Sequence, residues 1–334
     1  MAAASVESGA VPLRRESHWI HYMYGPDWAL PSISPKCLAL KLYLAFEGVR
    51  IAENHCNNPS MVAPEAGLPV LANTSTGRVA WDITNIVEWL ADNQIGSPLS
   101  TLNPADTAKT VELSGLLEAA LEPALLYNWY VEDQNFPVVA HAFTKHLSFP
   151  AAGIEAKQLR DKARSKLDAM GLLDGRIVYG RAAAAYGALA FELAKSTNPA
   201  SSSSSSSKKR WLLGDTPQLI DALIIGHLAL ALHAPMDPQA SKLLALVQEH
   251  PVLVSYANDA LRIFLRNAPT DLPHTSFPLP FPERMENTWT SARSFLSSGA
   301  SMTLVTLGIF GIVMYAGMKD YIPSRQQLFE FIRS

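Results

Sequence analysis

The chain has 334 residues, of which 48% are hydrophobic and 17% are charged, a balance that excludes a chain disordered throughout. Its net charge of −3 lacks the basic excess typical of nucleic-acid-binding proteins, so we expect no nucleic-acid partner. The two cysteines, Cys37 and Cys56, are too few for a disulfide framework or a four-cysteine zinc site, and they favour a reducing compartment.

Residues 1–16 are predicted to form a disordered tail. The stretch contains Ala, Ser and a late Arg14–Arg15 pair, but no apolar run of the length that a secretory signal requires. A transit peptide is the alternative, yet such peptides are rich in Arg and poor in acidic residues, and this segment fits that description badly.

The segment 17–95 is predicted to form a thioredoxin-like α/β domain. Its apolar residues recur first at strand spacing, then at helical spacing and then at strand spacing again, which indicates β-α-β order. Two short strands joined by a tight turn and followed by a helix complete the pattern. Pro69 opens the first of these short strands, a position compatible with a cis peptide bond. The expected elements are His18–Tyr24, Pro35–Gly48, Val49–His55, 67–71, 78–81 and 82–93.

The segment 104–267 is predicted to be all helical. Pro123 lies inside its first long amphipathic stretch and should bend or divide that helix. The helix expected over 217–233 is apolar on nearly all sides and contains Asp221, which predicts the buried central helix of a bundle. The Ser run 201–207 cannot bury apolar area, so we expect a flexible insertion there. The expected helices are 107–131, 155–172, 181–195, 217–233, 241–250 and 252–266.

A Pro-rich spacer, 268–293, precedes an uncharged segment, 294–318, and a short tail, 319–334. The apolar centre of this segment, 302–318, would reach about 26 Å as a helix, close to the roughly 30 Å of hydrocarbon in a bilayer. We therefore expect one C-terminal transmembrane anchor in the lipid bilayer, and the alternative is a buried core helix. The residues expected to form the anchor are Met302, Leu304, Leu307, Ile309, Phe310, Ile312, Val313 and Met318.

Several patches of the sequence resemble the metaxin family, the transferase-like subunits of the mitochondrial outer-membrane sorting and assembly machinery. The patches extend in pieces from Trp19 to Met318, and none of them is a catalytic signature. They comprise a first-helix segment, asparagine–proline and glycine-x-leucine–proline landmarks, the stretch around the buried helix, and a closing helix. In chain order they are Ser34–Val49, Asn58–Pro59, Gly67–Leu71, Trp211–Asp215 with Leu223–Leu228, and His250–Tyr256.

The resemblance implies a thioredoxin-like domain followed by an all-helical domain, the order of glutathione transferases, with one C-terminal transmembrane helix. It implies a non-enzymatic subunit without a cofactor, in the mitochondrial outer membrane, with most of the chain facing the cytosol. The implied partners are the β-barrel insertase and other subunits of the sorting and assembly machinery, and the outer-membrane translocase. In this role the chain would assist the insertion and release of β-barrel proteins.

A membrane-anchored, glutathione-dependent transferase is the alternative function. Active transferases hold the γ-glutamyl end of glutathione with an acid followed by Ser, whereas Asp82 is followed here by Ile83. The missing hydroxyl favours a vestigial fold that serves as a binding platform. Candidate groups for thiol chemistry in the expected neighbourhood are Tyr22, Tyr24, Ser32, Ser34 and Cys37.

The start of the buried helix departs from the transferase pattern. Transferase-like domains usually place Ser or Thr three residues before an Asp, which caps free backbone N–H groups, but counting back from Asp221 gives Gln218. Thr216 is the alternative cap, with Pro217 at the first helical position. The sequence leaves the start open between these two residues. Pro69, Asp82 and Asp221 are the expected fold landmarks.

No metal or thiol-exchange motif is predicted. Cys37 has no second cysteine three residues away, so we expect it to be a small buried residue of the first helix. His141 and His146 are five residues apart and do not share a helix face, and no zinc-binding histidine pair occurs elsewhere. His227, inside the apolar helix, is expected to be a hydrogen-bonded core residue.

Overall fold

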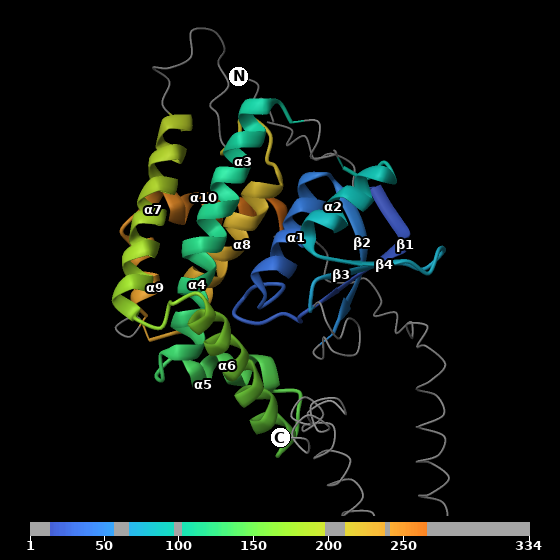
Figure 1. Cartoon of the computed structure of the whole chain (residues 1–334). Coiled ribbons are helices and arrows are strands. Elements are labelled where there is room, and N and C mark those ends of the chain that lie inside the picture. Colours follow the sequence, from blue (N-terminus) through green and yellow to red (C-terminus); the bar gives the residue numbers. More distant parts are fainter. Residues whose placement is uncertain (1–13, 57–66, 97–101, 198–210, 238–240, 266–334) are drawn as a thin grey trace, which may run out of the picture. The chain divides into compact units, whose positions relative to one another are not determined.

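The computed structural model describes residues 14–56, 67–96, 102–197, 211–237 and 241–265 (Figure 1). An α/β part comes first in the chain and an all-helical part follows it, as predicted. The elements of the α/β part are β1 (Arg14–Met23), α1 (Pro35–Phe46), β2 (Val49–His55), β3 (Val70–Asn73), β4 (Val79–Trp81) and α2 (Ile83–Asp92). The helical part contains α3 (Pro104–Leu116), η3 (Leu117–Leu121), α4 (Glu122–Leu126), η4 (Tyr127–Val131), α5 (Phe136–Thr144), α6 (Ala151–Ala169), α7 (Gly175–Thr197), α8 (Leu219–His233), α9 (Lys242–Gln248) and α10 (Pro251–Phe264).

The α/β part is built on a four-stranded sheet with the order β2-β1-β3-β4. β1 runs parallel to β2 and antiparallel to β3, where Tyr22 lies opposite Val70, and β3 runs antiparallel to β4. α1 makes the crossover between the two parallel strands, and α2 follows the hairpin, with Trp89 packed edge-on against Trp19. This is the predicted thioredoxin-like order.

α1 begins and ends at residues that suit its two termini. Ser34 is the N-cap, where its Oγ accepts the N–H of Cys37 at 3.4 Å, and Pro35 opens the helix at a position that needs no N–H. Gly48 follows the last turn with φ of 67°, a left-handed conformation that glycine adopts without steric cost. These two ends fix which face of α1 is turned toward the core.

The long helical stretch around Pro123 is divided, as predicted. Pro123 has no N–H to donate, and on each side of it the backbone hydrogen bonds span five residues instead of four. Glu122 N–H donates to the carbonyl of Leu117, and Glu132 N–H donates to that of Tyr127. Two widened π-helical segments, η3 and η4, therefore flank the proline within one continuous run.

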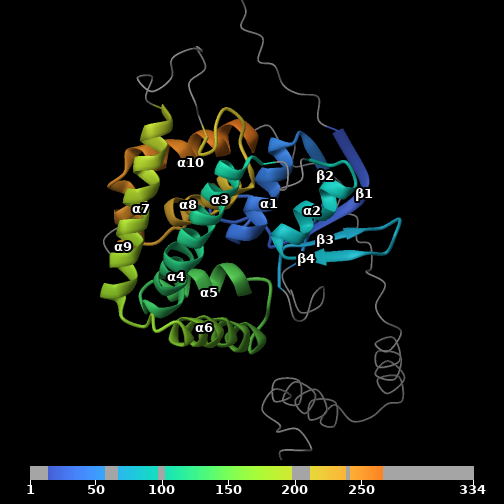
Figure 2. The ribbon, with the colours of Figure 1, turned by 45° about the horizontal axis from the view of Figure 1, so that its top comes forward.

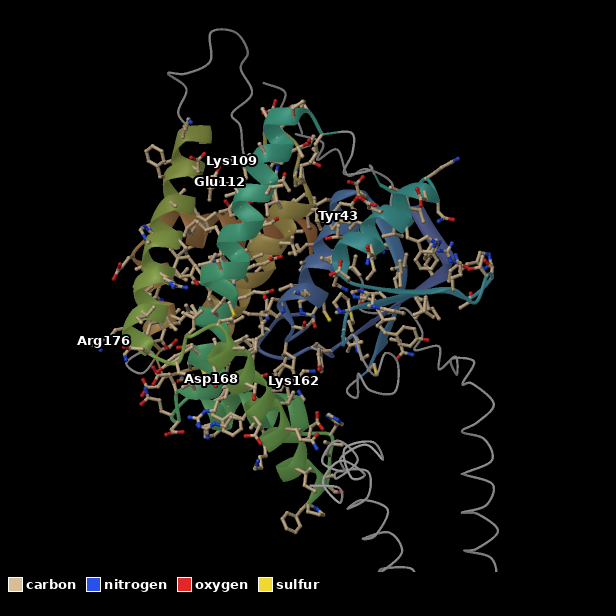
Figure 3. All side chains as sticks on the ribbon, in the orientation of Figure 1. Tyr43, Lys109, Glu112, Lys162, Asp168 and Arg176 are labelled. Carbon is tan, nitrogen blue, oxygen red and sulfur yellow. The ribbon has the colours of Figure 1, made fainter. Side chains whose placement is uncertain are left out.

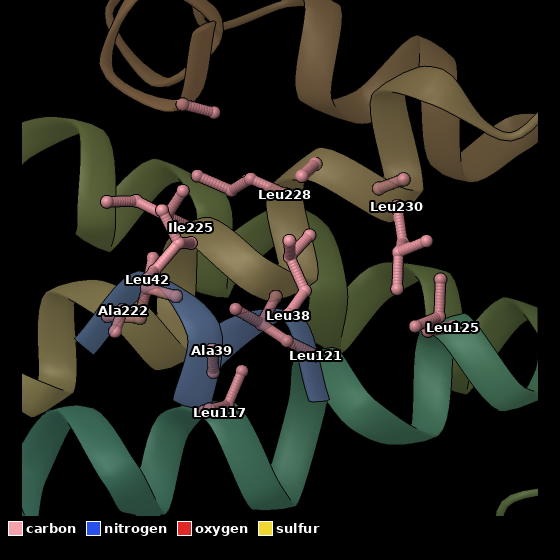
Figure 4. Packing of buried hydrophobic residues seen from close by; sticks show 14 of the residues in the cluster. Leu38, Ala39, Leu42, Leu117, Leu121, Leu125, Ala222, Ile225, Leu228 and Leu230 are labelled. Atoms are coloured by element: carbon pink, nitrogen blue, oxygen red, sulfur yellow. The ribbon is translucent and has the colours of Figure 1, made fainter. Parts of the chain in front are cut away.

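α8 is the buried central helix that the sequence predicted. Twelve of its 15 residues are buried, and α1 makes the most extensive contact between the two parts of the molecule with it. Side chains of α1, of η3 and α4, and of α8 converge on one apolar core (Figure 4). Each fully buried leucine or isoleucine in such a core contributes about 1.5–3 kcal/mol. The α1–α8 contact therefore ties the α/β part firmly to the helices.

The short helix α5 was missed by the sequence analysis. Its sequence contains a proline and two valines, which give it little intrinsic helix propensity. Val139, Ala142 and Phe143 are nevertheless buried, where α5 packs against α6 and η4. Tertiary packing thus decides the conformation of this segment. The next two helices also begin earlier than predicted, at Ala151 and Gly175.

The predicted fold class was wrong to include a transmembrane helix. No helix in the part of the chain that the structure describes is both long and apolar enough to cross a membrane. The most apolar one, α8, has 15 residues and is about 22 Å long, whereas the longer α6 and α7 are interrupted by charged residues. The predicted anchor, 294–318, and the eight residues assigned to it lie outside the described residues.

Candidate functional site at the domain interface

A small pocket lies where the α/β part meets the helical part. Its walls are the turn after β1, the end of β2 and the end of α5, and its volume is about 180 Å³. Sites for small molecules commonly occupy about 300–1,000 Å³, so the pocket is small for a tripeptide such as glutathione. The lining residues are Gly25, Pro26, Asp27, Ile33, His55, Ala142 and Lys145.

A strained turn forms one wall of this pocket. Trp28 and Ala29 have φ of 56° and 57°, a left-handed conformation that is costly for residues with a side chain. The turn is closed by backbone hydrogen bonds in both directions between Asp27 and Leu30, at 2.8 and 3.2 Å. Trp28 also packs edge-on against Trp129 of η4, with ring centroids 5.4 Å apart. The helical part therefore holds the turn in place.

An ion pair crosses the mouth of the pocket. The Asp27 carboxylate accepts hydrogen bonds from Lys145 Nζ and from the backbone N–H of Trp28, each at 2.8 Å. Partial burial raises the pKa of Asp27, but these two hydrogen bonds and the Lys145 charge outweigh it and hold the pKa below its ordinary value. The carboxylate is therefore ionised and already satisfied within the chain.

The groups that could support thiol chemistry lie inside the packed core and not along the pocket. Burial raises the pKa of the Cys37 thiol to about 11, despite hydrogen bonds involving Ser34 and Ser32, so the thiolate is disfavoured. Ser34 caps α1, and Ser32 Oγ accepts the N–H of Ser34 at 3.3 Å. Burial also raises the pKa values of Tyr22 and Tyr24. The prediction that Cys37 is a buried residue of the first helix is confirmed.

The landmark Asp82 serves as a helix cap. Its carboxylate accepts the N–H groups of Thr84 at 3.0 Å and Asn85 at 3.4 Å, at the first turn of α2. Ile83, which stands where active transferases carry a serine, is buried. Neither residue lines the pocket. The other landmark of this domain, Pro69, follows a cis peptide bond from Leu68 and leads directly into β3.

The landmark Asp221 organises the start of α8. It is fully buried, and its carboxylate accepts the N–H of Gln218 at 2.7 Å, the N–H of Leu212 at 2.9 Å and the hydroxyl of Tyr256. Burial raises the pKa of Asp221, and the three hydrogen bonds oppose that rise. Gln218 is therefore the residue before the helix, and the alternative cap at Thr216 was wrong. Asp221 ties α8 to α10 and to the loop before it.

Two further histidines are buried. His227 Nε2 lies 2.8 Å from the Tyr186 hydroxyl, which confirms the prediction of a hydrogen-bonded core residue. His21 of β1 has no partner for either ring nitrogen among the described residues. Burial lowers the pKa of each to about 3, so both are neutral. Nowhere in the described ranges do three His, Cys, Asp or Glu side chains gather as a metal site requires.

The sequence analysis did not identify the pocket or its ion pair. Asp27 and Lys145 are 118 residues apart in the chain, so no local pattern connects them. The turn was also hidden, because neither Trp28 nor Ala29 is a residue type that signals a left-handed conformation. Asp27 was the one available signal, since Asp often begins a turn by accepting a nearby backbone N–H.

Comparisons with known proteins agree with this architecture. A family model described as outer mitochondrial membrane transport complex protein matches residues 37–160, and one for the C-terminal domain of glutathione S-transferase matches 205–260. Metaxin-3 of Danio rerio is 24% identical over 255 residues, 73% of this chain and 75% of the relative. Metaxin-1 of Mus musculus is 24% identical over 296 residues, 88% of each chain.

Similar solved structures are glutathione transferases. One from Ceriporiopsis subvermispora, in complex with glutathione, is 14% identical with a TM-score of 0.49, covering 74% of this chain and 98% of that one. Another, from Phanerochaete chrysosporium, is 13% identical with a TM-score of 0.49, covering 72% of this chain and 97% of that one.

Proposed function

Because the chain belongs to the metaxin family, we propose that it takes part in protein import or sorting at the mitochondrial outer membrane. In finer detail, we propose a non-enzymatic subunit of the sorting and assembly machinery that faces the cytosol and assists the insertion of β-barrel proteins. The description of the matching family model and the length of the metaxin matches, up to 88% of both chains, support this proposal.

One observation favours a binding role over a catalytic one. The groups that a transferase would use for thiol chemistry are built into the core of this chain, with Cys37 completely buried and Ser34 occupied as a helix cap. The pocket beside them is only about 180 Å³ and contains an ion pair that is already satisfied. What the domain offers to a partner is therefore its outer surface.

The packing between the two parts suits such a platform. α1 and α8 share one core, and Gly226 of α8 brings the two helices so close that a Cβ there would lie 2.6 Å from the carbonyl oxygen of Pro35. A tightly packed interface resists relative motion of the two parts. Stable protein partners commonly bury about 1,200–2,000 Å² in total, which a rigid domain of this size can present.

Affinity purification tests the proposed role. The full chain, tagged and isolated from mitochondria in mild detergent, should co-purify with the β-barrel insertase and the other subunits of the sorting and assembly machinery. A Cys37→Ala variant is the matched control, because a binding platform needs no thiol and should retain the same partners. Loss of these partners from a folded chain, or their replacement by unrelated proteins, would contradict the proposal.

A glutathione-affinity column tests the alternative function, a glutathione-dependent transferase. The pocket's small volume and the buried Ile83 predict that the full chain passes through the column and shows no activity with common electrophiles. Retention followed by elution with free glutathione, together with activity that disappears in Tyr24→Phe or Ser34→Ala, would favour the transferase instead.

The proposed orientation can be tested on intact organelles. Protease added outside intact mitochondria should degrade the domain formed by residues 14–265 if this domain faces the cytosol. Protection of the domain, with degradation only after the outer membrane is ruptured, would overturn the orientation.

A further inference from the structure

The outer face of α7 is apolar and unpartnered among the described elements. Its inner face packs against η3, α4, α9 and α10, and α7 is the outermost labelled helix on its side of the described unit in both views (Figures 1 and 2). On the outer face, Ile177 is 45% exposed and Phe191 is 67% exposed. The outward positions between them are small: Gly180, Ala184 and Ala188. A second helix could approach this face closely.

These exposed residues are arranged symmetrically about Ala184. Ile177 and Phe191 each lie seven residues from it, and Gly180 and Ala188 each lie four residues from it. Seven residues make almost two complete helical turns, so the two large side chains project from nearly the same face as Ala184. An antiparallel copy of α7 crossing at Ala184 would place Ile177 against Phe191 of the second copy, and Gly180 against its Ala188.

The charges at the two ends of the face follow the same symmetry. Asp174 and Arg176 lie at the beginning of α7, where Arg176 points outward (Figure 3), and Glu192 and Lys195 lie near its end. In an antiparallel pair, Arg176 meets Glu192 of the second copy, and Asp174 comes beside its Lys195. Within one copy, Arg176 pairs with Asp174 at 3.1 Å and Glu192 with Lys109 at 3.2 Å, so the second copy would extend existing pairs. A parallel pair would instead bring like charges together.

We propose that the outer face of α7 is a self-association surface, on which a second copy of this chain docks antiparallel with the two-fold axis at Ala184. Such a contact is isologous, because each residue meets its symmetry mate's counterpart in both directions. One pair of helices buries less than a standard interface, so the dimer is weak and depends on protein concentration. This inference does not depend on the proposed import role.

Cysteine cross-linking of the full chain tests the two-fold axis. Only a residue at the axis meets itself, so Ala184→Cys should form a disulfide-linked dimer under mild oxidation, seen at twice the mass on a non-reducing gel. Val111→Cys is the matched control, because Val111 is 67% exposed on the neighbouring helix α3 but has no place at the axis. If Ala184→Cys gives no more dimer than Val111→Cys or the unmodified chain, the proposal is wrong.

Mixing two variants tests the antiparallel direction. Ile177→Cys and Phe191→Cys should each give little dimer alone, because the two copies of residue 177 lie far apart, as do those of 191. A mixture of the two should give the cross-linked heterodimer. Efficient cross-linking of Ile177→Cys with itself would show a parallel arrangement and overturn the proposal.

Discussion

The interface between the α/β part and the helices differs sharply between its interior and its mouth. In the interior, α1 and α8 are in such close contact that Gly226 has no room for a side chain, and the buried Asp221 holds the start of α8 with three hydrogen bonds. At the mouth, a partly exposed ion pair and a strained turn enclose a pocket of about 180 Å³.

The difference shows which part of a transferase-like architecture this chain has kept. The interior depends on packing and on fully satisfied buried groups, which are costly to disturb. The mouth, where a transferase would bind its substrate, depends on partly exposed contacts, each worth little on its own. We therefore expect substitutions in the interior to affect stability far more than substitutions at the mouth.

The largest effect is expected for Asp221→Ala. The substitution leaves the N–H groups of Leu212 and Gln218 and the hydroxyl of Tyr256 buried without their acceptor. We expect the free energy of unfolding to fall by about 3–5 kcal/mol, measured by urea unfolding of the full chain followed by tryptophan fluorescence. Asp215→Ala, an exposed carboxylate in the same loop, should change it by less than about 0.5 kcal/mol. Equal losses in the two variants would contradict the special role of Asp221.

The interior was largely predictable from the sequence, because its signals are local. The spacing of apolar residues located β2 at Val49–His55 and the buried character of α8, and Pro123 located the division of the first long helical run. The start of α8 was left open, because only the folded chain shows the Asp221 carboxylate reaching the N–H of Gln218.

The mouth was not predictable, because it depends on contacts between distant segments. The Asp27–Lys145 pair joins residues 118 positions apart, and Trp28 and Ala29 take left-handed conformations against their residue types. α5, which carries Ala142 into the pocket wall, has a sequence that favours a helix only when it is packed against α6 and η4. Tertiary contacts therefore build this region, and local patterns do not reveal it.

The second largest effect is expected from pH, through the two buried histidines. Burial lowers the pKa values of His21 and His227 from 6.5 to about 3. Above pH 6.5 neither state binds these protons, but as pH falls from 6.5 toward 3 the unfolded chain binds them and the folded chain does not, so stability is lost. Between pH 7 and pH 5 each histidine should lower the free energy of unfolding by about 2 kcal/mol, as measured by urea unfolding at the two pH values.

His21→Phe provides the control for this pH dependence. Neither ring nitrogen of His21 has a partner in the described ranges, so the substitution removes a titrating group without breaking a hydrogen bond there. The variant should lose about 2 kcal/mol less than the unmodified chain when pH falls from 7 to 5. Asp221 acts in the opposite direction, because burial raises its pKa, but it contributes equally to both proteins and cancels. Identical pH dependence in the two proteins would rule out His21 as a cause.

A smaller loss is expected for Gly226→Ala, in the closest contact between α1 and α8. The added Cβ would lie 2.6 Å from the Pro35 carbonyl oxygen and 3.3 Å from the Ala39 nitrogen, so the two helices must separate. We expect a loss of about 1–3 kcal/mol in urea unfolding, even though alanine is the better helix former. Gly115→Ala, on α3 with no atom within 4 Å of its added Cβ, should instead gain up to about 1 kcal/mol. A gain in both variants would show that the contact is not tight.

The smallest effect is expected at the mouth, for Asp27→Asn. The side chains of Lys145 and Asp27 are 45% and 28% exposed, and partly exposed ion pairs are typically worth about 0.2–1 kcal/mol. Asparagine keeps an oxygen that can accept the N–H of Trp28, so the strained turn should persist and only the charge is lost. The free energy of unfolding should therefore fall by less than about 1 kcal/mol, and the difference should shrink in 1 M salt, where the Debye length is about 3 Å. A loss as large as that of Asp221→Ala, unchanged by salt, would mean that the mouth supports the fold as strongly as the interior does.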